Sequence, residues 1–182
     1  WTQLESIFLA SEDIREQLPE DAKRFDGIDS AFREQMADAS QNSNPIEVCT
    51  VQGREDVFNA NFAALELCQK SLSDYLEVKK KKFPRFYFIS AADLVDILSK
   101  GRYPPAVQPH FSKFTDATGS IDWEPDADGK PTGVARGCVA IDGEKFPYPE
   151  FKQCEGAVED GLLLLMLHQA AMFRVKVKEA ID

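Results

Sequence analysis

The acidic residues around Asp126 come nearest to a chemical site in this sequence. Four residues follow the spacing of the first half of a calcium-binding loop, in which carboxylates supply oxygen ligands: Glu124, Asp126, Asp128 and Gly129. The position that should carry the bidentate Glu is Ala135, which has no ligand atom. The pattern therefore predicts a solvated loop beside a hairpin, and no calcium ligand is assigned.

The sequence also lacks the residue spacing that a phosphate-binding loop or a zinc site requires. Lys130 follows Gly129 as in a phosphate-binding loop, but Pro131 replaces the required Ser or Thr and Glu124 replaces the first Gly. The two histidines, at 110 and 168, have no metal-ligand spacing with any cysteine. Six carboxylates between residues 13 and 29 are interpreted as a solvated helical face: Asp13, Glu16, Glu20, Asp21, Asp26 and Asp29. No catalytic, cofactor-binding or metal-binding residue is predicted, and the segment is not expected to be an enzyme.

Charge and composition limit the classes of partner that the chain can be expected to bind. The chain has 182 residues, a formal net charge of −10 and 43% hydrophobic residues, which is typical of a folded soluble chain. A surface that neutralises nucleic-acid phosphates must be basic, so nucleic acid is not expected as a partner. The longest apolar run, 162–167, is far shorter than the roughly 20 residues of a membrane span. Four cysteines without a C-x-x-C pair are interpreted as reduced thiols: Cys49, Cys68, Cys138 and Cys154.

Apolar residues at intervals of three and four predict that helices dominate the chain. Short helices are expected before and after Ser11, and a longer one begins at Pro19. A long helix is predicted over 54–78, with Lys79 to Lys82 at its C-terminal end. That lysine run complements the helix dipole, or forms a patch for an acidic partner or part of a nuclear signal. One shared core is predicted: Phe62, Leu65, Cys68, Leu72, Leu76, Leu94 and Leu98.

The middle of the chain changes character twice. Phe83-Pro84 should end the long helix. The four aromatic residues Phe83, Phe86, Tyr87 and Phe88 are expected in the core, with a ligand platform as the alternative. Ser90 with Asp93 predicts the start of another helix, which Gly101 should close. The alternation near 121–148 and the pair Asp142-Gly143 predict a small antiparallel β-hairpin, since both turn residues would take positive φ. The expected fold is mainly α, with elongated helical bundles and this β insertion.

Six short segments of the sequence resemble segments of one protein family. They are ESIF, SEDIR, QLPEDAKRFDGID, CQKSLSDYLE, FPRFYFIS and DLVDILSKG, in this order. Together they are similar to the linker region of a dynein heavy chain, with the axonemal (ciliary) branch the better fit. The resemblance is strong over residues 1 to about 115 and weaker beyond.

The resemblance implies a division of the chain and a mechanical role. The expected parts are a helical linker bundle over 1–115, the β insertion over 116–153 and the start of the next linker helix over 154–182, in a fragment of a longer chain. Such a linker couples ATP turnover in the AAA ring to movement of the tail along microtubules, in the axoneme of a cilium or flagellum. ATP and Mg would be bound elsewhere in the parent chain.

The implied partners are the AAA ring and tail of the same heavy chain and other dynein subunits, with microtubules reached only through the parent motor and no membrane contact. An alternative from another class is a free-standing helical scaffold or adaptor that binds proteins through exposed apolar stripes. If the segment is a lever, we expect 83–90 to be stiff and any bend to lie near 101–105 or at the hairpin, because few side chains should pack there.

Overall fold

The computed structural model describes residues 1–42, 44–101, 103–154 and 156–181. The chain forms two compact units, Trp1–Tyr75 and Leu76–Asp182. The first unit is helical in its described part, and the second combines helices with a three-stranded antiparallel sheet. The expected mainly α fold with a small β insertion is confirmed. The division expected at residues 115 and 153 stays a prediction.

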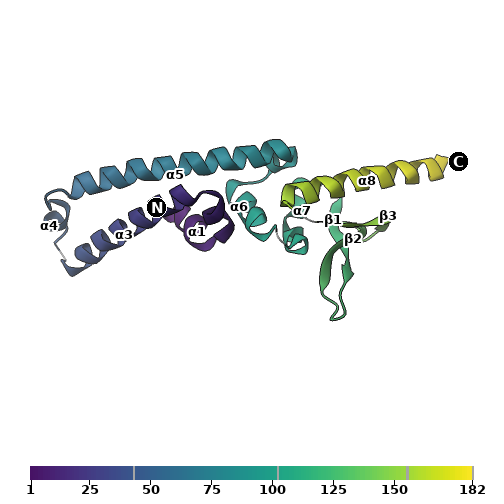
Figure 1. Cartoon of the computed structure of the whole chain (residues 1–182), viewed down its shortest axis with the longest axis horizontal. Coiled ribbons are helices and arrows are strands. Elements are labelled where there is room, and N and C mark those ends of the chain that lie inside the picture. The colour runs from purple at the N-terminus through teal and green to yellow at the C-terminus, as the bar shows by residue number, and fades with distance from the viewer. Residues whose placement is uncertain (43, 102, 155, 182) are drawn as a thin grey trace. The chain divides into compact units, whose positions relative to one another are not determined.

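Five helices contribute to the first unit (Figure 1): α1 (Thr2–Ala10), α2 (Glu12–Gln17), α3 (Pro19–Gln41), α4 (Pro45–Cys49) and the first part of α5 (Arg54–Lys82). The Ser11 side chain accepts a hydrogen bond from the Ile14 backbone N–H, as expected of the residue that caps α2. Pro19 opens α3, which continues unbroken through Gly27.

The core of the first unit lies where α1 and α2 pack on the first half of α3. Phe8 and Phe25 are fully buried and stack with ring centroids 5.3 Å apart. Cys68 on α5 is also buried, and its thiol donates to the Asp21 carbonyl. The single shared core predicted from the sequence is wrong in one member, because Phe62 is 64% exposed. Its other members divide between the two units after Tyr75.

The second unit begins with the last turns of α5, which extend over all four lysines to Lys82, beyond the predicted end at 78. Positive charge at a helix C-terminus favours this extension. Five further helical elements follow: the 3₁₀ helices η1 (Pro84–Phe88) and η2 (Pro104–His110), and the α-helices α6 (Ala91–Lys100), α7 (Phe111–Phe114) and α8 (Val158–Ile181). Ser90 caps α6 by accepting from the Asp93 N–H at 3.1 Å.

The aromatic residues around η1 were expected in the core, and only two of the four lie there. Phe83 and Phe86 are buried, and the Phe83 ring meets the Phe114 ring edge-on. Tyr87 and Phe88 are exposed. The reason is the spacing of the tight 3₁₀ turn, in which side chains three residues apart align. Phe86 and Ile89 are both buried, so Tyr87 and Phe88, which lie between them, point outward.

The sheet contains β1 (Thr118–Pro125), β2 (Pro131–Ala140) and β3 (Lys145–Gln153), in that spatial order. Ile121 on β1 lies opposite Cys138 on β2, and Cys138 lies opposite Phe146 on β3. The sheet extends beyond the predicted 121–148, because β1 begins at Thr118 and β3 ends at Gln153. Gly137 permits the irregular pairing with β3, because a Cβ atom there would lie 2.5 Å from the Phe146 carbonyl oxygen.

The predicted hairpin at Asp142-Gly143 is present, but its turn differs from the expectation. Only Gly143 has a positive φ, of 91°, and Asp142 does not. The Asp142 carboxylate accepts from the Glu144 N–H and so closes a longer loop with a single left-handed residue. A second hairpin joins β1 to β2, so Asp142-Gly143 is not the sole hairpin turn.

Candidate functional site

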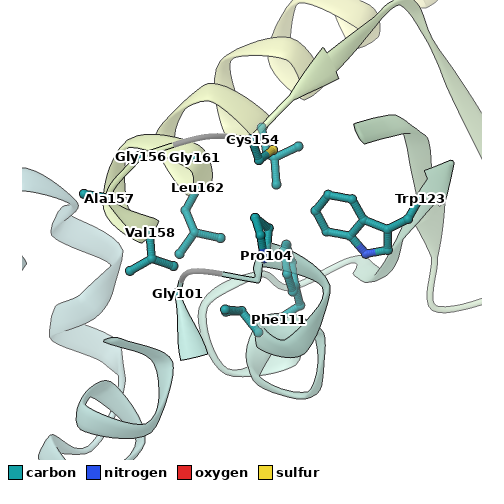
Figure 2. A pocket seen from close by; sticks show the side chains of 12 residues that line it. Gly101, Pro104, Phe111, Trp123, Cys154, Gly156, Ala157, Val158, Gly161 and Leu162 are labelled. Atoms are coloured by element: carbon teal, nitrogen blue, oxygen red, sulfur yellow. The ribbon is translucent and has the colours of Figure 1, made fainter. Parts of the chain in front are cut away.

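The start of α8 is the point at which most elements of the second unit meet. The buried face of α8 includes Val158, Glu159, Gly161, Leu162 and Leu165. Figure 2 shows Val158 beside Gly101, and Leu162 facing the cluster that contains Pro104 and Phe111. This junction joins the first turns of α8 to the end of α6, to η2 and to the sheet, and we define it here as the α8 junction.

Gly101 ends α6 for a reason of packing. Its φ of −63° is available to any residue, so the left-handed geometry that usually favours glycine at helix ends is not needed. A Cβ atom at Gly101 would lie 2.6 Å from the Val158 Cβ atom, closer than two carbon atoms can approach without movement. The absence of a side chain therefore allows α8 to begin against the end of α6.

A small hollow remains at the centre of the α8 junction. It has a cavity volume of about 10 Å³ and is lined mostly by apolar groups, among them Pro104, Phe111, Trp123, Cys154 and Leu162 (Figure 2). A space of this size holds at most one water molecule, whereas small-molecule sites occupy roughly 300 to 1,000 Å³. The hollow is a packing feature and has no room for a nucleotide.

Charged residues hold the same turn of α8 from its other side. The Glu159 side chain is 2% exposed, and its Oε1 accepts from Lys79 Nζ at 2.8 Å and from Lys82 Nζ at 3.5 Å. Lys82 also donates to Asp160 at 2.7 Å, and this hydrogen bond raises the pKa of the lysine against the lowering effect of burial. The lysines at the C-terminus of α5 and the acids at the N-terminus of α8 have opposite charges, and each set also complements the partial charge of its own helix end.

This arrangement gives the lysine run a specific role within the chain. The sequence left open whether it complements the helix dipole, binds an acidic partner or forms part of a nuclear signal. In the structure, Lys79 and Lys82 pair with the acids of the first turn of α8. The sequence signal was the four-lysine run together with Glu159-Asp160 at a predicted helix start, and the burial of Glu159 was missed.

The residues considered for metal chemistry are used elsewhere. The Asp126 carboxylate accepts from the N–H groups of Asp128 and Lys130, within the exposed turn between β1 and β2. His110 Nε2 lies 2.7 Å from an Asp96 oxygen, whereas His168 Nδ1 bonds the Leu164 carbonyl one turn back on α8. Within the described ranges, no group of three or more His, Cys, Asp or Glu side chains could hold a metal ion.

Several acidic residues of the first unit take part in ion pairs. Asp26 pairs with Arg15, which keeps the pKa of this carboxyl below its usual range. Asp29 bonds both Arg33 and the Trp1 indole N–H. Asp21 pairs with Arg24 and is itself buried, so it does not belong to a solvated face. None of the described helices is both long and apolar enough to span a membrane.

Comparison with known proteins gives the family. Residues 1–180 match the family described as "Dynein heavy chain, N-terminal region 2". The whole chain is 41% identical to the "Dynein beta chain, ciliary" of Heliocidaris crassispina, the "Dynein beta chain, flagellar outer arm" of Chlamydomonas reinhardtii and the human "Dynein axonemal heavy chain 9". It spans only 4% of the length of each of these relatives. The resemblance to axonemal heavy chains is therefore confirmed.

Proposed function

The chain belongs to the dynein heavy chain family, and from this membership we propose that it is a mechanical linker segment of an axonemal heavy chain. It couples ATP turnover in the AAA ring to movement of the tail along microtubules in the axoneme of a cilium or flagellum. The relatives named above, which are ciliary, flagellar and axonemal chains, support this assignment. ATP and Mg bind elsewhere in the parent chain, and the segment itself performs no catalysis.

The observation that supports a mechanical role is the α8 junction. A segment that transmits force needs its helices joined by contacts that resist separation. Here, the first turn of α8 is held on one side by close apolar packing against Gly101 and on the other by the buried pair between Glu159 and Lys79. Breaking either contact should allow α8 to move without moving the rest of the second unit.

The proposed partners follow from the same role. They are the AAA ring and the tail of the same heavy chain, together with other dynein subunits, and microtubules are reached only through the parent motor. The net charge of −10 is unfavourable for binding nucleic acid or an anionic membrane surface.

The test measures ATP turnover and movement separately in the full heavy chain. Glu159→Ala should leave microtubule-stimulated ATP hydrolysis close to that of the unaltered motor, while gliding velocity falls, because the lever becomes compliant. The matched control is Glu150→Ala, which removes an exposed acid paired with Lys152 on the sheet. A variant whose velocity and hydrolysis both stay unchanged, or fall in proportion, would contradict the coupling role.

A further inference from the structure

The first unit contains an open aromatic groove that the proposed lever function does not use. It has a volume of about 400 Å³ and lies between α1, α3 and the first part of α5. Its apolar lining consists of Trp1, Ile28, Phe32, Phe58, Phe62 and Leu65. Trp1 and Phe32 stack at 4.7 Å, which gives the groove a fixed aromatic wall. We call this feature the aromatic groove.

One residue of the aromatic groove is unusual for a soluble surface. Phe62 is 64% exposed, although it lies beside other aromatic side chains. A contiguous exposed aromatic surface is typical of a place where another protein element packs.

Charge distinguishes the surroundings of the groove from the rest of the chain. Residues 1–75 contain fifteen Asp and Glu against six Lys and Arg, whereas residues 76–182 are almost balanced, with sixteen against fifteen. On α5, Glu55 lies three residues before Phe58 and Glu66 lies four residues after Phe62, so the two acids flank the groove-lining stripe about one turn from either end. Both are exposed, and no ion pair of either is present in the described part of the chain.

We propose that the aromatic groove docks a basic amphipathic helix of another protein chain. Apolar side chains spaced three and four residues apart along such a helix fit a groove with this apolar lining. Lys and Arg on its flanks would face Glu55 and Glu66, and complementary charge would speed the encounter and select the partner. A second copy of this chain is a poor occupant, because it would bring the same excess of acids against itself.

The binding test uses the 182-residue chain and two synthetic peptides of about five helical turns. Both have leucines at the same helical spacing, and the flanking positions are lysine in one and glutamate in the other. Trp1 lines the groove, so its fluorescence reports docking in a Trp123→Phe variant that keeps no other tryptophan. Calorimetry on the unaltered chain gives the same comparison without that substitution. We expect the lysine peptide to bind, the glutamate peptide not to bind, and added salt to weaken binding.

Two variants localise the interaction. Phe62→Ser should weaken the lysine peptide by roughly tenfold or more, since a buried aromatic contact is lost. Phe88→Ser is the matched control, because Phe88 is also an exposed phenylalanine, 79% accessible, and lies in the other unit. Reversing the charge at Glu55 and Glu66 to lysine should transfer preference to the glutamate peptide.

Four results would overturn the proposal. They are absence of binding, equal binding of both peptides, equal binding by Phe62→Ser and the unaltered chain, and self-association of the chain that Phe62→Ser abolishes. The last would identify the occupant as a second copy. Because Phe62 is mostly exposed, its replacement should leave the circular dichroism spectrum unchanged, so a loss of binding cannot be attributed to unfolding.

Discussion

Replacing Glu159 with Ala should loosen the first turn of α8 more than any other change of one charged side chain in the second unit. Glu159 is almost completely buried and accepts from two lysines. Without the carboxylate, Lys79, whose side chain is only 20% exposed, loses this counter-charge in a poorly solvated position. Lys82 keeps its pair with Asp160 and is about half exposed, so it contributes less to the cost.

The magnitude follows from the burial of the two partners. Removing one member of a buried ion pair destabilises a protein by about 3 to 5 kcal/mol. Lys79 retains some contact with water, which places the expected loss near the lower end, at about 3 kcal/mol. A loss of that size corresponds to roughly a hundredfold increase in the population of the opened junction. Glu159→Gln, which keeps the shape and a hydrogen-bonding oxygen, should have a smaller effect.

Two of the three buried cysteines, Cys154 and Cys68, provide an assay with one reporter in each unit. Cys154 lies against Gly161 of α8, and burial raises the pKa of its thiol to about 11. Its alkylation at neutral pH therefore requires opening of the α8 junction. Cys68 is buried in the first unit and serves as the internal reference. When closing is faster than alkylation, the rate at Cys154 follows the opening equilibrium, so Glu159→Ala should raise it by about two orders of magnitude.

The result is informative only against a matched acid. Glu150→Ala removes an exposed carboxylate from an ion pair with Lys152, and exposed pairs contribute about 0 to 1 kcal/mol. Its Cys154 alkylation should stay within a few-fold of the unaltered chain. The reasoning is wrong if Glu159→Ala behaves like Glu150→Ala. It is also wrong if the rate at Cys68 rises as much as the rate at Cys154, because the loss would then not be local.

Three further outcomes are expected. Gly101→Ala should destabilise the second unit by about 1 to 3 kcal/mol through overpacking, whereas Gly27→Ala, with nothing near its Cβ position, should stabilise α3 by about 0.5 to 1 kcal/mol; urea titrations of each variant measure both. Cys49 is the exposed thiol, so mass spectrometry after brief native alkylation should find the label there long before it reaches the buried cysteines. The hydrogen bond from Lys113 lowers the pKa of Asp93. The stability that this carboxyl contributes is therefore present above its unfolded pKa of about 4 and is lost as the pH falls through the folded pKa. Asp93→Asn should weaken the dependence of the unfolding free energy on pH in this acid range.

Local signals in the sequence predicted most helix boundaries. Ser11 and Ser90 each cap the helix that follows, and Pro19 opens α3, because these residues act through bonds to their immediate neighbours. The sheet and its hairpin were predicted for the same reason. The type of turn at Asp142-Gly143 was not, since the extra residue in the loop depends on how β2 and β3 pair over their whole length.

The features that could not be predicted from the sequence are those that depend on tertiary packing. Phe62 continues the apolar rhythm of α5, yet it is exposed, because periodicity shows which residues share a face and cannot show whether another element covers it. Glu159 is the opposite case, an acidic residue that is buried. An acidic residue in the first turn of a helix is usually solvated, and the helix dipole is enough to explain its position. The burial of Glu159 depends on its ion pair with Lys79, which the sequence does not reveal.

The position of a hinge stays a prediction, and the structure changes the reasons for it. A bend near 101–105 was favoured because little side-chain mass was expected there, but Gly101 lies in direct contact with Val158, and Pro105 is buried. A bend at that point therefore requires α8 to separate from the end of α6. A bend at 83–90 would instead have to separate Phe83 from Phe114. Separation at Gly101 exposes the buried Val158, whereas separating Phe83 from Phe114 exposes two larger buried side chains, so we still expect 83–90 to be the costlier place to bend. Heavy chains trapped with and without nucleotide decide the matter: movement at 83–90 with 101–105 unchanged would place the hinge at the aromatic residues.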